Sequence, residues 1–271
     1  MSGKSVSSKG VWLCGAAAAV LVPAVLLLSE HMGNRRWYIT GSLIIIISII
    51  PFFAGFENRK PEARELVTIA VMCAIAVISR IVFMPLQGFK PIVGIVMITG
   101  MAFGPSAGFL TGAVSAFVSN FVFGQGAWTP WQMCAFGIAG FIAGLLAGKG
   151  PVKPVCTVPA ALRKNKSVKF IAQRLPVGLF GFFMIVVLVG PILDTCTLFT
   201  MTTVVNRASA AAVYMSGLLY NLWHGLAVGL TMFFLSGPVL EKLDRLKIKY
   251  GMTGWRVSAD RQIPADEERS R

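Results

Sequence analysis

The chain alternates between long apolar segments and shorter polar ones that are often basic. A membrane-spanning helix needs roughly 20 mostly apolar residues. The pattern therefore predicts an all-α integral membrane protein with about eight spans. The fourth segment is short and contains Pro91, so we expect it to be broken or re-entrant, which is tolerated where the chain lines a cavity. The eight predicted segments are residues 11–28, 37–56, 66–86, 89–103, 106–123, 131–147, 175–200 and 210–236.

Polar stretches divide the chain into three predicted regions. A charged linker, residues 57–65, separates the first two segments (residues 1–60) from a core of six helices (residues 61–250). The polar tail, residues 251–271, is predicted to be a disordered cytoplasmic extension. The first segment follows two lysines, as a signal peptide would, but no small-residue cleavage site comes directly after it. We therefore interpret it as a retained anchor helix.

Lys and Arg are distributed unevenly among the loops between the predicted helices. If both termini of an eight-span chain lie on one side, that side holds 20 of these residues and the other side holds four. The loop from Lys149 to Arg174 alone holds seven. Cytoplasmic loops carry such an excess of basic residues. The distribution therefore predicts cytoplasmic termini in a bacterial inner (plasma) membrane.

Composition and motifs narrow the classes of function. Apolar residues make up 55% of the chain and charged residues 13%, whereas soluble domains carry about 25% charged residues. A net charge of +14 is often associated with nucleic acid, but here the basic residues flank apolar segments, so we expect membrane lipid and no nucleic acid as a partner. No CxxC pair, phosphate loop, zinc-protease or hydrolase motif occurs. We therefore predict no metal site, no cofactor and no catalytic residues.

Polar residues within the predicted spans gather towards the outer side of the membrane. Ionisable residues in a bilayer are costly and usually face an interior cavity. Arg80, Asn120 and Asp194 lie near the outer ends of their helices, and His224 lies near the middle of the last helix. The orientation came from the loop charges alone, so this shared depth is a separate observation. It predicts a polar pocket that opens to the outer face.

The last helix and the segment before the sixth helix add further candidates. Tyr220 and His224 are four residues apart and share a helix face, with Asn221 beside them. Trp128 and Trp131 lie on either side of a proline at the outer surface and could cover a flat ligand. We therefore expect the ligand to be bound by Arg80, Lys90, Asn120, Trp128, Trp131, Gln132, Asp194, Asn221 and His224.

Each of these residues also has a purely structural interpretation. Tryptophans are typical anchors at a membrane interface. Arg80 and Asp194 could pair only to neutralise each other, and His224 could bond to a carbonyl of a neighbouring helix. Asn120 could simply join two helices. The alternatives stay open at this stage, and the constellation is more informative than any single member.

Small residues recur at intervals of four on three of the predicted helices. Such rows let another helix approach closely. Ala70 and Ala74 form one row, for which packing within the chain and docking of a partner are both open. Packing within the chain's own bundle is the preferred interpretation for the glycine rows, which are Gly108–Gly112 and Gly140–Gly144–Gly148.

Four short motifs stand between residues 63 and 148: Ala70-xxx-Ala74, Gly104-Pro-Ser-Ala-Gly108, Ser119-Asn-Phe-Val-Phe-Gly124 and Trp128-Thr-Pro-Trp-Gln-Met133. With these motifs the chain resembles the substrate-binding S components of energy-coupling factor (ECF) transporters. The last motif is fairly specific, and the glycine and alanine motifs are weak. The resemblance covers residues 62–249 and excludes the first two helices, because the family core has six.

The resemblance implies a six-helix subunit that binds a vitamin or related micronutrient from outside. It also implies docking on a transmembrane coupling subunit driven by two ATPase subunits, which would hydrolyse the ATP. Ala70 and Ala74 match the alanine motif involved in docking. Ligand residues vary within the family, so the vitamin stays open. We place a corrinoid first and a riboflavin-like or other flat heterocycle second, with Arg80 and Lys90 suited to an anionic group.

Two other classes of function remain open at this stage. An ion-coupled secondary carrier would transport a small molecule without ATPase partners, with Asp194 as its proton site. An intramembrane enzyme or assembly factor could use Asp194 and His224 for acid–base chemistry. No nucleophile or metal motif accompanies these two residues.

Overall fold

The computed structural model describes residues 63–149, 166–202 and 205–251, and every regular element in these ranges is helical. Five helical segments are long and apolar enough to cross a membrane, and a sixth is a shorter apolar helix. These six match the predicted core. The first two predicted spans and most of the polar tail lie outside the described residues. The elements are α3 (Ala63–Val82), α4 (Ile92–Phe103), α5 (Pro105–Phe123), α6 (Thr129–Lys149), α7 (Lys166–Phe183), η2 (Met184–Val189), α8 (Gly190–Met201) and α9 (Arg207–Lys249).

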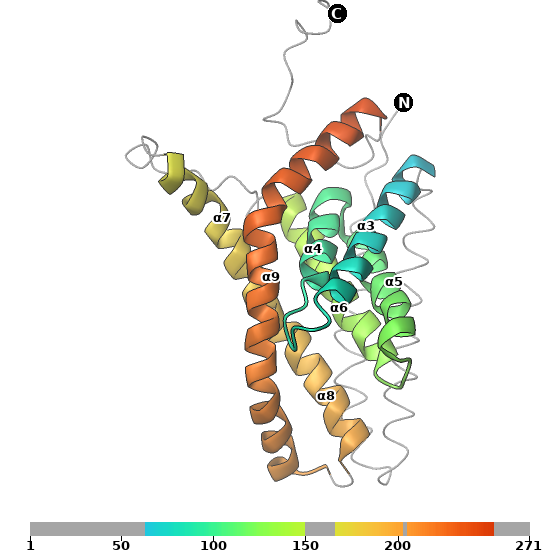
Figure 1. Ribbon diagram of the computed structural model, residues 1–271, viewed down its shortest axis with the longest axis vertical. Helices are drawn as coiled ribbons and strands as arrows, with labels where there is room; N and C mark the ends of the chain where they lie inside the picture. Colours follow the sequence, from blue (N-terminus) through green and yellow to red (C-terminus); the bar gives the residue numbers. More distant parts are fainter. Residues whose placement is uncertain (1–62, 150–165, 203–204, 252–271) are drawn as a thin grey trace, which may run out of the picture.

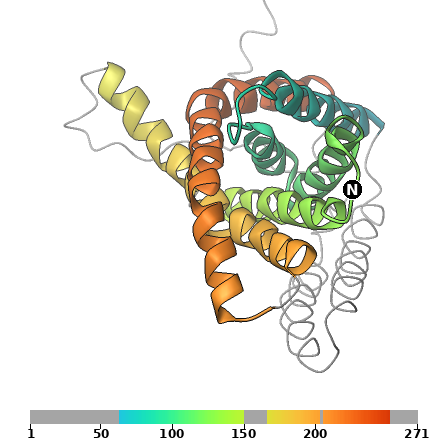
Figure 2. The same ribbon diagram turned by 60° about the horizontal axis from the view of Figure 1, so that its bottom comes forward.

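Helix α4 lies at the centre of the bundle, and α3, α5, α6 and α9 surround it (Figure 2). All of its residues are buried. Twelve residues rise only about 18 Å, so α4 is shorter than the roughly 30 Å hydrocarbon layer. The predicted shortness of the fourth segment is thus confirmed, but the helix is not broken, because Pro91 lies at its N-cap. Its apolar sequence on every side explains why protein surrounds it.

The predicted ends of two helices were wrong. The loop expected from Lys149 to Arg174 is shorter, because α7 begins at Lys166. The last helix does not end near Ser236 but continues to Lys249. Beyond Ser236 the buried residues Leu240, Leu243 and Lys247 recur at helical spacing, so this basic segment still packs on the bundle.

Helix α9 is the longest element and runs along one side of the bundle (Figure 1). Figure 2 shows that it bends before its end. Pro238 lies inside the helix, and a proline in a helix interior removes a backbone hydrogen bond and causes a kink. We attribute the bend to this residue. Helix α7, the π-helical segment η2 and α8 follow one another without a break, and all three contact α9.

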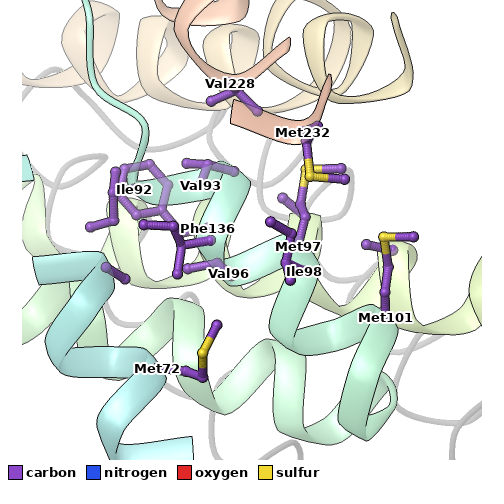
Figure 3. Close-up of a cluster of buried hydrophobic side chains, with 14 of the residues drawn as sticks. Met72, Ile92, Val93, Val96, Met97, Ile98, Met101, Phe136, Val228 and Met232 are labelled. Atoms are coloured by element: carbon purple, nitrogen blue, oxygen red, sulfur yellow. The ribbon is translucent and has the colours of Figure 1, made fainter. Parts of the chain in front are cut away.

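The main core joins α3, α4, α6 and α9 (Figure 3). Its larger members include Met72 of α3, Met97 of α4, Phe136 of α6 and Met232 of α9. Met97 and Met232 belong to one cluster of buried side chains, in which the central helix α4 packs against α9 (Figure 3).

Glycines allow α4, α5 and α6 to pack with their backbones in contact. A Cβ atom on Gly100 would lie 2.1 Å from the carbonyl oxygen of Gly140, and one on Gly108 would lie 2.4 Å from the same oxygen. A Cβ atom on Gly112 would lie 2.5 Å from the backbone of Phe136. No side chain fits at these distances. The glycine rows therefore pack within the chain's own bundle, as expected.

Candidate functional site

Arg80 lies in the last turn of α3, and its side chain is buried. Its side chain is 5% exposed, and Nη1 donates hydrogen bonds to the Ser119 hydroxyl and to Asn120 Oδ1, the latter at 2.9 Å. Among the described residues no acid pairs with it. The predicted alternative of an Arg80–Asp194 pair is therefore wrong, because neutral acceptors on α5 hold Arg80 instead.

Asn120 links the arginine to the start of α6. Its Nδ2 donates to Thr129 Oγ1 at 3.1 Å and to Gln132 Oε1 at 2.8 Å. Asn120 is fully buried, and a buried amide needs such partners. Asn120 therefore joins α5 to α6, as its structural interpretation predicted. It also holds the Arg80 side chain in place. Ser119 stood within a recognised motif, but sequence reasoning gave neither it nor Thr129 a role.

Lys90 approaches the same place from the loop between α3 and α4. Its Nζ lies 5.1 Å from the ring centroid of Phe123, and the guanidinium carbon of Arg80 lies 4.4 Å from that centroid. Lys90 Nζ also lies 6.0 Å from the centroid of the Tyr220 ring. Cations near aromatic faces are attracted by the ring quadrupole. Phe123 thus lies beside both Arg80 and Lys90. Its position at the end of a helix gave no reason to predict this role.

His224 completes this group from α9. It is 4% exposed and lies beside the backbone of Lys90. Its ring packs edge to face on Tyr220 and on Phe136, with centroids 6.3 Å and 6.4 Å away. The predicted shared face of Tyr220 and His224 is confirmed.

Asp194 belongs to a separate contact between α8 and α9. Its Oδ2 accepts a hydrogen bond of 2.7 Å from Asn221 Nδ2. Two glycines make room for it: a Cβ atom on Gly217 would lie 2.3 Å from Asp194 Oδ1, and one on Gly190 would lie 2.5 Å from the Asn221 side chain. Asp194 and Asn221 are therefore held by each other. The sequence predicted that Asp194 and Asn221 share one pocket with Arg80. In the structure, the hydrogen bonds of Arg80 go to α5 instead.

The two tryptophans do not lie together over the arginine group. Trp131 is buried in a second core, where its ring centroid lies 6.0 Å from that of Phe199. Trp128 is 38% exposed and its ring covers Gly126. The aromatic rings beside the cations are instead Phe123, which lies next to Arg80 and Lys90, and Tyr220, which lies next to Lys90. A direct role for the tryptophans in ligand binding stays a prediction.

The alanines of α3 lie away from this group. Ala70 and Ala74 are exposed, whereas Ala76 is fully buried in the core. Val67, Val71 and other large apolar residues of α3 are exposed as well. An apolar face of this kind is typical of contact with lipid or with another membrane helix.

Arg80, Lys90, Phe123, Tyr220 and His224 will be called the cationic cluster. Two of its buried polar atoms, Arg80 Nε and His224 Nε2, have no hydrogen-bond partner. Such atoms are uncommon and require an explanation, and a bound molecule is one. In the ranges described here, no group of His, Cys, Asp and Glu could hold a metal ion. The cluster therefore combines two cations, aromatic rings and two buried polar atoms without a partner.

Comparison with known proteins places this arrangement in a family. The model of the family described as "ECF-type riboflavin transporter, S component" matches residues 60–239. No curated protein and no solved structure gives a significant match. The match covers more than half of the chain, including α3 to α8 and most of α9. The chain therefore belongs to the S components of ECF-type riboflavin transporters.

Proposed function

We propose that this chain captures a riboflavin-like flat heterocycle at the outer face of a bacterial plasma membrane and delivers it inward. The observation that carries the proposal is the cationic cluster, in which two aromatic rings flank two cations and two buried polar atoms lack partners. A ligand pocket typically combines aromatic walls with a few placed polar groups. The cluster offers this combination at the junction of α3, α5 and α9.

The class of ligand follows from the family and from the rings. S components are substrate-binding subunits of transporters and not enzymes, and the matching family is riboflavin-type. Phe123 and Tyr220 present ring faces that suit stacking on a flat heterocycle. We therefore prefer a riboflavin-like ligand to the corrinoid that the sequence alone favoured.

The energy for uptake comes from other subunits. Membership of the family implies association with a transmembrane coupling subunit and with ATPase subunits. We propose that Ala70 and Ala74 form the contact with the coupling subunit, because both are exposed on α3. Small residues at such positions let a partner helix approach closely. The excess of basic residues in the predicted inner loops supports cytoplasmic termini.

A binding assay and an uptake assay together test this proposal. The purified full-length protein, without ATP, should quench the fluorescence of added riboflavin in a saturable way. Vesicles that contain this chain and co-expressed coupling and ATPase subunits should accumulate riboflavin, and vesicles with this chain alone should not. Uptake by the chain alone, driven by a proton gradient and lost in Asp194→Asn, would instead support the secondary carrier. Absence of binding by riboflavin and by its phosphate ester alike would reject the ligand class.

A further inference from the structure

The cationic cluster contains more positive charge than the surrounding protein balances. Arg80 is 5% exposed, and Lys90 is partly buried. No described Asp or Glu pairs with either residue. A buried charge is costly unless a counter-charge or several hydrogen bonds compensate it. The cluster is therefore incomplete as a purely structural feature.

The way in which Arg80 is held leaves one edge of its guanidinium group free. Both of its hydrogen bonds use Nη1, towards Ser119 and Asn120. Nε is buried without a partner. An arginine presents its donors in a rigid planar fork that binds the two oxygens of a carboxylate or phosphate. The Nε–Nη2 edge of Arg80 is available for this kind of contact.

Lys90 lies where it can contribute to the same contact. Its ammonium group and the Arg80 guanidinium approach the same Phe123 ring. Phe123 is only partly buried and Tyr220 is 40% exposed, so the cluster is open on the side of Lys90. A lysine supplies a mobile point charge, whereas the buried arginine fixes the geometry. Both cations thus lie within about 5 Å of the centre of one aromatic ring.

We propose that Arg80 and Lys90 bind an oxyanion carried by the transported ligand, a phosphate or a carboxylate attached to the flat heterocycle. This inference rests on the proposed function and specifies its ligand: an anionic heterocycle is preferred to the neutral vitamin. The phosphate of a phospholipid has the same chemistry, so the experiment separates the two sources.

The test compares two flavins that differ only in charge. Riboflavin and flavin mononucleotide share the ring system and the side chain, and only the second carries a phosphate. Their affinities for the purified full-length protein are measured by fluorescence quenching. Because hydrogen bonds between two charged groups are stronger than neutral ones, we expect the wild-type protein to bind flavin mononucleotide tenfold or more tightly than riboflavin, which is about 1.4 kcal/mol.

Three variants assign this preference to named residues. Lys90→Gln should remove most of the preference for flavin mononucleotide, because it removes the point charge beside Arg80 that the phosphate would contact. Arg80→Lys keeps the charge but loses the fork, and should reduce the preference in part. Arg207→Gln is the matched control: this arginine is exposed at the start of α9, and its loss removes the same charge without touching the cluster.

Each result decides the inference. Equal affinity for the two flavins, or a preference that survives Lys90→Gln, overturns it and leaves the proposed function intact. Displacement of flavin mononucleotide by phosphatidylglycerol, but not by phosphatidylcholine, assigns the oxyanion to lipid and overturns it as well.

If neither flavin binds, the proposed ligand class fails and mass spectrometry of co-purified small molecules decides instead. An anionic compound retained by the wild type and depleted from Lys90→Gln supports the oxyanion site. A neutral compound, or none, overturns it.

Discussion

Replacing Gly140 by alanine tests whether backbone contact between α5 and α6 holds the bundle together. The new Cβ atom would lie 2.4 Å from the carbonyl oxygen of Gly108, whereas ordinary contact begins at 3.4 Å. The two helices must therefore separate by about 1 Å at this point. The obstacle is backbone, so no side chain can rotate away to relieve it.

The magnitude follows from what the separation costs. A gap of 0.5–1 Å loses about a quarter to a half of the van der Waals attraction between the facing atoms. Overpacking of a well-packed core costs about 1–3 kcal/mol. Alanine is more favourable than glycine in a helix by about 1 kcal/mol. A net loss of stability would therefore show that the steric cost of the new methyl group exceeds this gain. Relative to a glycine-to-alanine control with the same gain in propensity, 1–3 kcal/mol corresponds to a fall in Tm of roughly 2–12 °C for a chain of this size.

Thermal unfolding of the purified protein in one detergent, at one scan rate, measures this fall. The control is Gly225→Ala, because the nearest atoms to its new Cβ are side-chain atoms of Phe182 and Val186 at 3.1 Å, which can adjust. Its gain in helix propensity is the same. A Tm for Gly140→Ala that equals or exceeds that of Gly225→Ala would refute the argument from close packing.

Three further predictions concern other contacts of the bundle. Ala74→Trp should leave riboflavin binding intact and prevent co-purification with the coupling subunit, whereas Leu219→Trp, at a 67% exposed site on α9, should permit it; equal recovery of both complexes would remove Ala74 from the docking face. Asn221→Leu removes a hydrogen-bond donor to Asp194, so we expect a loss of about 1–3 kcal/mol in thermal unfolding, which a second substitution, Asp194→Leu, should partly restore. Lys247→Met removes a hydrogen bond to the backbone of α4 and should lower the free energy of unfolding by a similar amount. An unchanged Tm would show that this bond does not stabilise the bundle.

The six core helices could be predicted because apolar length is a local property of the sequence. Each predicted span from residue 66 to residue 236 corresponds to an observed helix or to the continuous run from α7 to α8. The positions of Arg80 and Asn120 near the ends of their helices could also be predicted, because apolar length sets those ends. The extension of α9 to Lys249 could not be predicted, because Pro238 and the basic residues that follow are typical of the end of a membrane helix. Only contact with α4 reveals that Leu243 and Lys247 are buried.

The pairing of polar side chains could not be predicted for a different reason. Residues at equal depth on different helices share a height in the membrane but not a direction around the bundle axis. Arg80 and Asp194 illustrate this: both are near helix ends, yet Arg80 faces α5 and Asp194 faces α9. The rotation of each helix is set by packing, such as the glycine contacts between α5 and α6. Sequence spacing therefore gave the candidates but not their partners.

The same packing explains why the cationic cluster lies where it does. Glycine contacts hold α4, α5 and α6 with their backbones touching, so Asn120, Thr129 and Gln132 are fixed in one rigid unit that orients Arg80. Tyr220 and His224 come from α9, which packs closely on α4: a Cβ atom on Gly94 would lie 2.8 Å from the Thr231 side chain. A ligand that contacts both Arg80 and Tyr220 would therefore connect α3 to α9. The two unpartnered atoms of the cluster, Arg80 Nε and His224 Nε2, belong to α3 and α9 respectively, so a molecule that bonds to both would stabilise the position of α9 relative to α3.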